Sequence, residues 1–148
     1  MMPNDEMDAP LAPLVLVVED DPDVRRIAAE IFHEAELKTA EASTAEEALA
    51  FLREHAPDVR LVLTDMVLPG RLDGIDLARV ASLRWPWIRV VVTTGWARVK
   101  DIPQNVVFLP KPWRASDLYA HLEWEETRLA SAVPRSLRSP PSGSSKRH

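Results

Sequence analysis

The sequence predicts an α/β protein in which a five-stranded parallel sheet is covered by helices on both faces. Two observations carry this prediction. Short apolar runs alternate with segments of helical spacing along residues 14–130. The first run, residues 14–18, is continuous and rich in valine, which is typical of a strand buried on both faces. With 148 residues and a hydrophobic content of 46%, the chain is long enough for one domain with its own core.

A helix is expected directly after this first strand. Asp21 can cap it, and Pro22 suits its first position. Three apolar residues at helical spacing give it one face: Ile27, Ile31 and Ala35.

The next β–α unit begins with residues 37–42, whose polar alternation suits an edge strand. The stretch from Ser43 to Glu46 has the pattern of a capping box and predicts the start of a second helix. Four apolar residues predict the inner face of that helix: Ala45, Ala48, Leu49 and Leu52.

Three more strands are expected at residues 59–64, 88–93 and 106–109, with helices at 75–84 and 115–129. Leu118, Leu122 and Leu129 are expected to face inward in the last helix. Only Gly95 to Asn105 separates the last two strands, whereas a parallel crossover needs about 10–12 residues. The helix between them is therefore expected to be short or absent.

The ends of the chain differ from this body. Residues 1–13 and the Ser-, Pro- and Arg-rich residues 131–148 are expected to be disordered, which leaves residues 14–130 as the domain. All 23 acidic residues and 13 of the 18 Lys and Arg lie in residues 1–127, a net charge of −10, and the remaining tail carries +5. An acidic body argues against nucleic-acid binding.

Composition excludes several other classes. The chain has no cysteine, so a disulfide scaffold, a thiolate metal site and a Cys nucleophile are ruled out. No apolar run approaches the roughly 18–20 residues of a membrane span, and the N-terminal stretch is not a signal peptide. A cytoplasmic protein without a membrane partner is expected.

Chemically active residues gather at the carboxyl ends of the expected strands, which is where open α/β sheets bind ligands. They are Glu19, Asp20, Asp21, Asp65, Thr93, Thr94 and Lys111. Clustered carboxylates repel one another unless a cation lies between them, and oxygen ligands suit Mg²⁺. Together with a hydroxyl and a lysine, they fit in-line phosphoryl transfer to a carboxylate.

Four sequence blocks at these strand ends resemble the receiver domain of two-component response regulators. They are Leu14-Val-Leu-Val-Val-Glu-Asp-Asp, Leu63-Thr-Asp-Met-Val-Leu-Pro-Gly with Asp73-Gly74, Val92-Thr-Thr-Gly, and Leu109-Pro-Lys-Pro-Trp. The resemblance covers roughly residues 14–130. It implies a flavodoxin-like (CheY-like) fold with strand order 2-1-3-4-5. The chain is similar to stand-alone receivers in which the fourth helix is reduced.

The resemblance also implies roles for individual residues. Asp65 matches the phosphoacceptor, and Lys111 matches the phosphate-binding lysine before a typically cis proline. Glu19 and Asp20 match the acidic pair that binds Mg²⁺ together with Asp65, and the third protein ligand is the backbone carbonyl of Val67. Asp21 lies one place beyond the pair, where its capping role suffices.

Two further positions are implied for switching. Thr94 matches the switch hydroxyl, although Thr93 competes for this role because strand alternation points the two to opposite faces. Phe108 matches the aromatic residue that often rotates on activation. In the implied mechanism, a histidine kinase or histidine phosphotransferase donates the phosphoryl group, and the aspartyl phosphate biases a two-state surface read by a downstream protein.

Val67 and Trp96 match the positions that flank the phosphoryl group, and both are apolar. One hypothesis is that they shield the acyl phosphate from water; the alternative is that Trp96 packs elsewhere. Residues 96–104 are expected to be flexible without phosphate and Mg²⁺. Trp113 is expected to lie near the site.

Three alternatives to a stand-alone, phosphorylatable, non-enzymatic receiver stay open. The chain can be the receiver of a hybrid histidine kinase. It can be a phosphatase or phosphotransferase with Asp65 as nucleophile, although such enzymes usually place a second acid where Val67 stands. It can also be a receiver that is not phosphorylated and serves as a binding module.

Overall fold

The computed structural model describes residues 13–95, 103 and 105–122. The strands are β1 (Leu14–Val18), β2 (Lys38–Ala42), β3 (Val59–Asp65), β4 (Arg89–Thr94) and β5 (Val106–Pro110). The helical elements are α2 (Pro22–Glu34), α3 (Ala45–His55), the short 3₁₀ helix η1 (Ala56–Asp58) and α4 (Gly74–Arg84). Residues 115–122 form a further helical segment.

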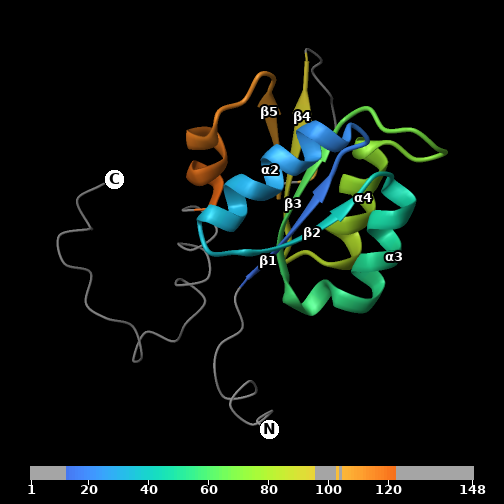
Figure 1. Cartoon of the computed structure of the whole chain (residues 1–148). Helices are drawn as coiled ribbons and strands as arrows, with labels where there is room; N and C mark the ends of the chain where they lie inside the picture. The colour runs from blue at the N-terminus through green and yellow to red at the C-terminus, as the bar shows by residue number, and fades with distance from the viewer. Residues whose placement is uncertain (1–12, 96–102, 104, 123–148) are drawn as a thin grey trace, which may run out of the picture.

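All five strands run parallel in one sheet of order β2-β1-β3-β4-β5 (Figure 1). Helix α2 and residues 115–122 cover one face, and α3 and α4 cover the other (Figure 1). This is the flavodoxin-like architecture that the sequence predicts, and the expected strand order is confirmed.

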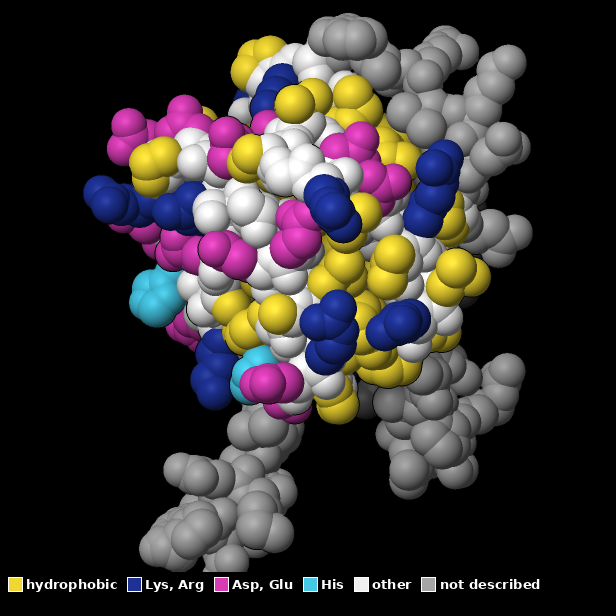
Figure 2. Space-filling model, turned by 90° about the vertical axis from the view of Figure 1, so that its right-hand side faces the viewer, with side chains coloured by type: hydrophobic (Ala, Val, Ile, Leu, Met, Phe, Trp, Pro, Cys, Tyr) yellow, Lys and Arg dark blue, Asp and Glu magenta, His cyan; other side chains and the backbone are white. Residues whose placement is uncertain are grey.

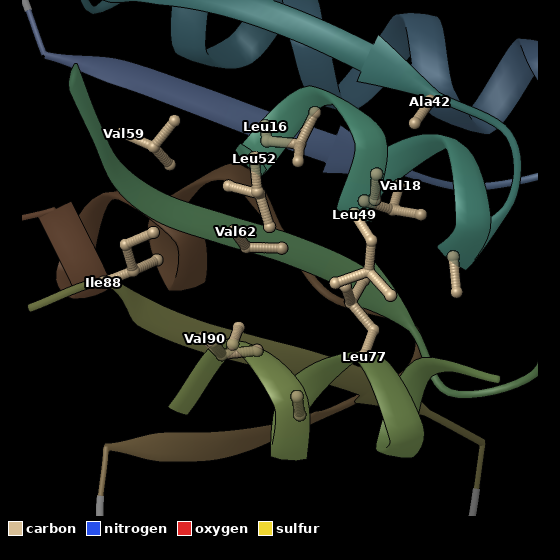
Figure 3. Close-up of a cluster of buried hydrophobic side chains, with 14 of the residues drawn as sticks. Leu16, Val18, Ala42, Leu49, Leu52, Val59, Val62, Leu77, Ile88 and Val90 are labelled. Carbon is tan, nitrogen blue, oxygen red and sulfur yellow. The ribbon is translucent and has the colours of Figure 1, made fainter. Parts of the chain in front are cut away.

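Side-chain alternation along the strands divides the core into two clusters. Figure 3 shows the cluster between the sheet and helices α3 and α4, where Leu16, Val62 and Val90 meet Leu52 and Leu77. The opposite cluster contains the intervening strand residues together with Phe32 of α2 and Leu118 of the last helical segment. Burial on both faces is what the continuous apolar strands require.

The helix starts follow from their capping residues, with one correction. Asp21 caps α2 as expected, because its Oδ1 accepts from the backbone N–H of Asp23 at 2.9 Å. The expected capping box from Ser43 to Glu46 is wrong by one position. Thr44 is the cap of α3 and accepts from the N–H of Glu47, whose own Oε1 accepts from the N–H of Ser43 at 2.8 Å.

Backbone hydrogen bonds hold both ends of the loop between β3 and α4 next to the strand ends. The N–H of Met66 donates to the Thr93 carbonyl, and the N–H of Gly74 donates to the Met66 carbonyl, each at 2.9 Å. Gly74 lies so close to the backbone of Asp65 that a Cβ would collide with the Asp65 carbonyl. Helix α4 therefore starts in direct backbone contact with the end of β3.

Figure 2 shows the face built by α3 and α4, where acidic side chains gather over one part and Lys and Arg side chains lie among apolar ones over another. Leu83, at the end of α4, is 84% exposed. Among the described residues, no helix is long and apolar enough to cross a membrane.

Several expectations fall outside the described residues. They are the disorder expected for residues 1–12 and 131–148, the short helix and flexibility expected within residues 96–104, the position of Trp96, and the end of the last helix at residue 129. Pro13, expected to be disordered, is described, and its carbonyl accepts from the N–H of Lys38 at 3.2 Å.

Candidate phosphoacceptor site

Three carboxylates meet at the carboxyl edge of the sheet. Glu19 directly follows β1, Asp20 comes next, and Asp65 ends β3. Because neighbouring parallel strands end at the same edge, their carboxylates converge, and one oxygen of each lies within 4.8 Å of the others. The structure thus brings together the three acidic residues that the sequence singles out. Asp21 instead faces its own helix as a cap.

Glu19 is the buried member of this cluster, with 7% of its surface exposed. Burial, together with the nearby carboxylates of Asp65 and Asp20, raises the pKa of the Glu19 carboxyl to about 7. The N–H of Asp21 and the ammonium of Lys111 act in the opposite direction. A carboxyl with this pKa exchanges its proton near neutral pH. A divalent cation would replace that proton and relieve the repulsion.

Lys111 supplies the positive charge opposite the cluster. It directly follows β5, and its Nζ lies 3.1 Å from Oδ2 of Asp65. Its backbone N–H donates to the Thr94 carbonyl at 2.8 Å, which fixes the start of its loop against β4. The Lys111–Pro112 peptide bond is cis, as the resemblance implied.

Arg25, which no sequence pattern singled out, holds the loop that carries the acidic pair. Its Nη1 donates to the backbone carbonyl of Glu19 at 2.7 Å, and its Nε donates to Glu41 at 3.0 Å. The Glu19 carboxylate also accepts from the N–H of Asp21 at 3.1 Å. The loop between β1 and α2 is therefore fixed by hydrogen bonds on both sides of the acidic residues.

The two competing threonines occupy different places. Thr93 pairs with Asp65 in the sheet register and lines a small pocket together with Glu19 and Asp65. Its hydroxyl donates to the Thr64 carbonyl at 3.5 Å. Thr94 is the last residue of β4, is buried, and lies beside Lys111 through the backbone hydrogen bond described above.

The remaining site positions differ in exposure. Val67 is 68% exposed, and its N–H donates to Oδ1 of Asp65 at 3.4 Å, which puts its backbone beside the acceptor carboxylate. Trp113 lines the same pocket as Asp65, as expected. Phe108 packs against the cluster beneath α3 and α4 and pairs with Val92 in the sheet.

This arrangement can bind a hard cation and present a carboxylate to an electrophile. The donor set consists of carboxylate oxygens, which suit Mg²⁺, and the half-exposed rim leaves room for the waters and the phosphoryl oxygen that this ion also binds. The ammonium of Lys111 beside it is a point charge of the kind that can pair with a phosphoryl oxygen.

Known proteins of one family resemble this chain in sequence and fold. The family model of the response regulator receiver domain matches residues 15–123. The chain therefore belongs to the response regulator receiver family, whose members are signalling modules of two-component systems.

Three proteins illustrate the relationship. The response regulator receiver protein CpdR of Brucella abortus is 32% identical over 114 residues, which cover 74% of this chain and 92% of CpdR. The sporulation initiation phosphotransferase F of Bacillus subtilis is 30% identical over 91 residues, 62% of this chain and 71% of that protein. The solved receiver domain of the hybrid histidine kinase CckA is 29% identical, with a TM-score of 0.66, and covers 76% of this chain and 97% of that one. These relatives support a phosphorylatable receiver in two-component signal transduction.

Proposed function

We propose that Asp65 accepts a phosphoryl group from the phosphohistidine of a histidine kinase or a histidine phosphotransferase, in a reaction that requires Mg²⁺. The observation that carries this proposal is the contact between Lys111 and Asp65, 3.1 Å long, beside the carboxylates of Glu19 and Asp20. A nucleophilic carboxylate, a phosphate-binding ammonium and a cation-binding acidic pair are thereby held on one rim.

The chemistry assigned to each residue follows from its position. An oxygen of Asp65 attacks the phosphorus as the bond to the donor histidine nitrogen breaks, giving an aspartyl phosphate. Lys111 then pairs with a phosphoryl oxygen in place of the carboxylate, and the Thr94 hydroxyl donates to another. Mg²⁺, held by Glu19, Asp20, Asp65 and the Val67 carbonyl, would neutralise charge that develops on the phosphoryl group.

The surroundings of Asp65 favour a phosphoacceptor over a turnover phosphatase. Two residues after the nucleophile, where an enzyme of that class needs a general acid, stands Val67, which has no titratable group. The aspartyl phosphate would signal by protein contact or pass its phosphoryl group onward, either from a separate receiver or from the receiver of a hybrid kinase.

The test is phosphorylation with acetyl phosphate, and binding of beryllofluoride, each with and without Mg²⁺. We expect Mg²⁺-dependent labelling of the wild type and none of Asp65→Asn. Asp58→Asn, which changes an acidic residue of η1, is the matched control and should be labelled normally. Labelling that survives Asp65→Asn would assign the acceptor to another residue, and absence of labelling from the wild type would refute the proposal.

A further inference from the structure

One acidic side chain outside the site reaches the loop that carries Val67. Glu46 lies in the first turn of α3, and its Oε2 accepts from the backbone N–H groups of Arg71 at 3.0 Å and Leu72 at 3.1 Å. These contacts join residues separated by 25 and 26 positions in the chain. A single carboxylate therefore ties the loop between β3 and α4 to the neighbouring helix.

The loop is shaped to receive this carboxylate. Gly70 has a φ of +100°, a conformation that favours glycine, and a Cβ at this position would lie 2.9 Å from Oε1 of Glu46. The next two N–H groups both point at Oε2. Successive backbone N–H groups next to a left-handed residue form a concave site for an anion, which the Glu46 carboxylate fills.

The contact is not needed to cap α3. Thr44 serves that purpose, and Glu47 supports it, because the Glu47 Oε1 accepts from the N–H of Ser43 at 2.8 Å and from the Ser43 hydroxyl at 3.0 Å. Donation from N–H groups lowers the pKa of both carboxyls, for Glu46 from its own N–H and those of Leu72 and Arg71. Adjacent glutamates in one helical turn thus have separate tasks.

What Glu46 holds is the segment next to the acceptor. Leu68 is buried in the core beneath α3 and α4, and Val67 contacts the Asp65 carboxylate through its N–H. The Glu46 contact holds the far side of the same turn, so Val67 lies on a segment fixed at both sides. Without it, the turn can move, and the Val67 backbone can move with it.

We infer that Glu46 is a positioning residue that holds the β3–α4 loop so that the Val67 backbone stays in place for Mg²⁺ and the phosphoryl group. The inference rests on the proposed function, because it assigns Glu46 a role toward the same metal site. Glu46 does not touch that site and acts through the loop.

The test compares Mg²⁺ titrations, followed by calorimetry, of the wild type, Glu46→Ala, Glu46→Gln and Glu47→Ala. For Glu46→Ala we expect the Mg²⁺ dissociation constant to rise by roughly threefold to tenfold, less than the ~10–100-fold typical of a residue bonded directly to a metal ligand. Glu46→Gln keeps an acceptor oxygen and should recover part of the affinity. Glu47→Ala keeps the Thr44 cap but removes the hydrogen bonds between the Glu47 carboxylate and Ser43. It should lower the melting temperature while leaving Mg²⁺ affinity within about twofold, since contacts at a helix start act on stability.

Amide hydrogen exchange supplies a second readout without metal. Exchange at Arg71 and Leu72 should be faster in Glu46→Ala than in Glu47→Ala. Equal Mg²⁺ affinities for the wild type and Glu46→Ala would overturn the inference and leave the proposed function standing. Equal losses in Glu46→Ala and Glu47→Ala would also overturn it, because the effect would then be one of stability. A wild type that binds no Mg²⁺ would overturn both.

Discussion

The Lys111 ammonium lies 3.1 Å from Oδ2 of Asp65, across the width of β4, which separates the two strands that carry them. The Asp65 side chain is 12% exposed and that of Lys111 is 37% exposed, so the pair is screened only in part. Lys111 therefore balances part of the charge of three converging carboxylates whenever no cation is bound.

Replacing Lys111 should destabilise the metal-free protein more than the Mg²⁺-bound one. Lys111→Ala leaves three carboxylates facing one another, and we expect a loss of about 1 kcal/mol in the free energy of unfolding at neutral pH, given a half-exposed pair. Saturating Mg²⁺ should reduce the deficit, because the bound ion takes over the neutralising role. Urea unfolding with and without Mg²⁺ measures both values, and an equal deficit in the two conditions would contradict this account.

Glu19 should make the metal-free protein less stable as the pH rises. Its folded pKa of about 7 lies above the usual 4.5, so the folded state holds a proton that the unfolded state releases. Stability from this group is present below pH 4.5 and is lost as the pH rises toward 7. Glu19→Gln removes the penalty and should be more stable than the wild type by about 3 kcal/mol at pH 8 without metal.

The measurement is chemical denaturation of both proteins between pH 4 and pH 8, with chelator present. The two proteins should have similar stabilities near pH 4 and diverge as the pH increases. A difference that stays constant over this range would show that folding does not shift the pKa of Glu19.

Substitution of Thr93 and Thr94 should show which of them supplies the switch hydroxyl. Thr94→Val is expected to weaken beryllofluoride binding by roughly tenfold, the effect of losing one hydrogen bond to a charged group. The Thr93 hydroxyl donates to the Thr64 carbonyl instead. Thr93→Val should therefore bind beryllofluoride nearly as tightly as the wild type. Isothermal titration in the presence of Mg²⁺ measures both, and the reverse order of effects would make Thr93 the switch hydroxyl.

Val67 should slow loss of the phosphoryl group. Its backbone N–H contacts the acceptor carboxylate, and we expect its apolar side chain to shield the acyl phosphate without offering a group that orients water. Val67→Asn should shorten the lifetime of the phosphorylated protein by roughly threefold to tenfold, less than the ~100-fold effect of a positioned general base. Leu83→Asn, at the exposed end of α4, is the control. If the two variants lose phosphate at the wild-type rate, shielding by Val67 is wrong.

Most of the fold follows from patterns in the sequence. Continuous apolar runs and capping residues predicted the strands and helices, and differences at their ends have local causes. Leu37 was expected in the edge strand, but its N–H donates to the Phe32 carbonyl as α2 ends, so β2 starts at Lys38. Ile88 donates to the Trp85 carbonyl in the same way, and β4 starts one residue later than expected.

The sequence predicted those site residues that directly follow a strand. Asp65, Glu19 and Lys111 follow strands, and parallel strands bring their ends together. Arg25 and Glu46 were missed because their partners are backbone groups of loops, and no periodic pattern describes the path of a loop. The single signal for Glu46 was misleading, since its spacing from Ser43 imitates a capping box.

The close approach of Gly74 to Asp65 gives the fold a mechanical property. Since no side chain separates the start of α4 from the strand end that carries Asp65, the two have no slack between them. We therefore expect a displacement of the Asp65 backbone to move the start of α4, a helix of 11 residues, about 16 Å long. Its other end carries Leu83, in the open. A rigid helix of this length would carry a structural change at Asp65 to the exposed surface around Leu83.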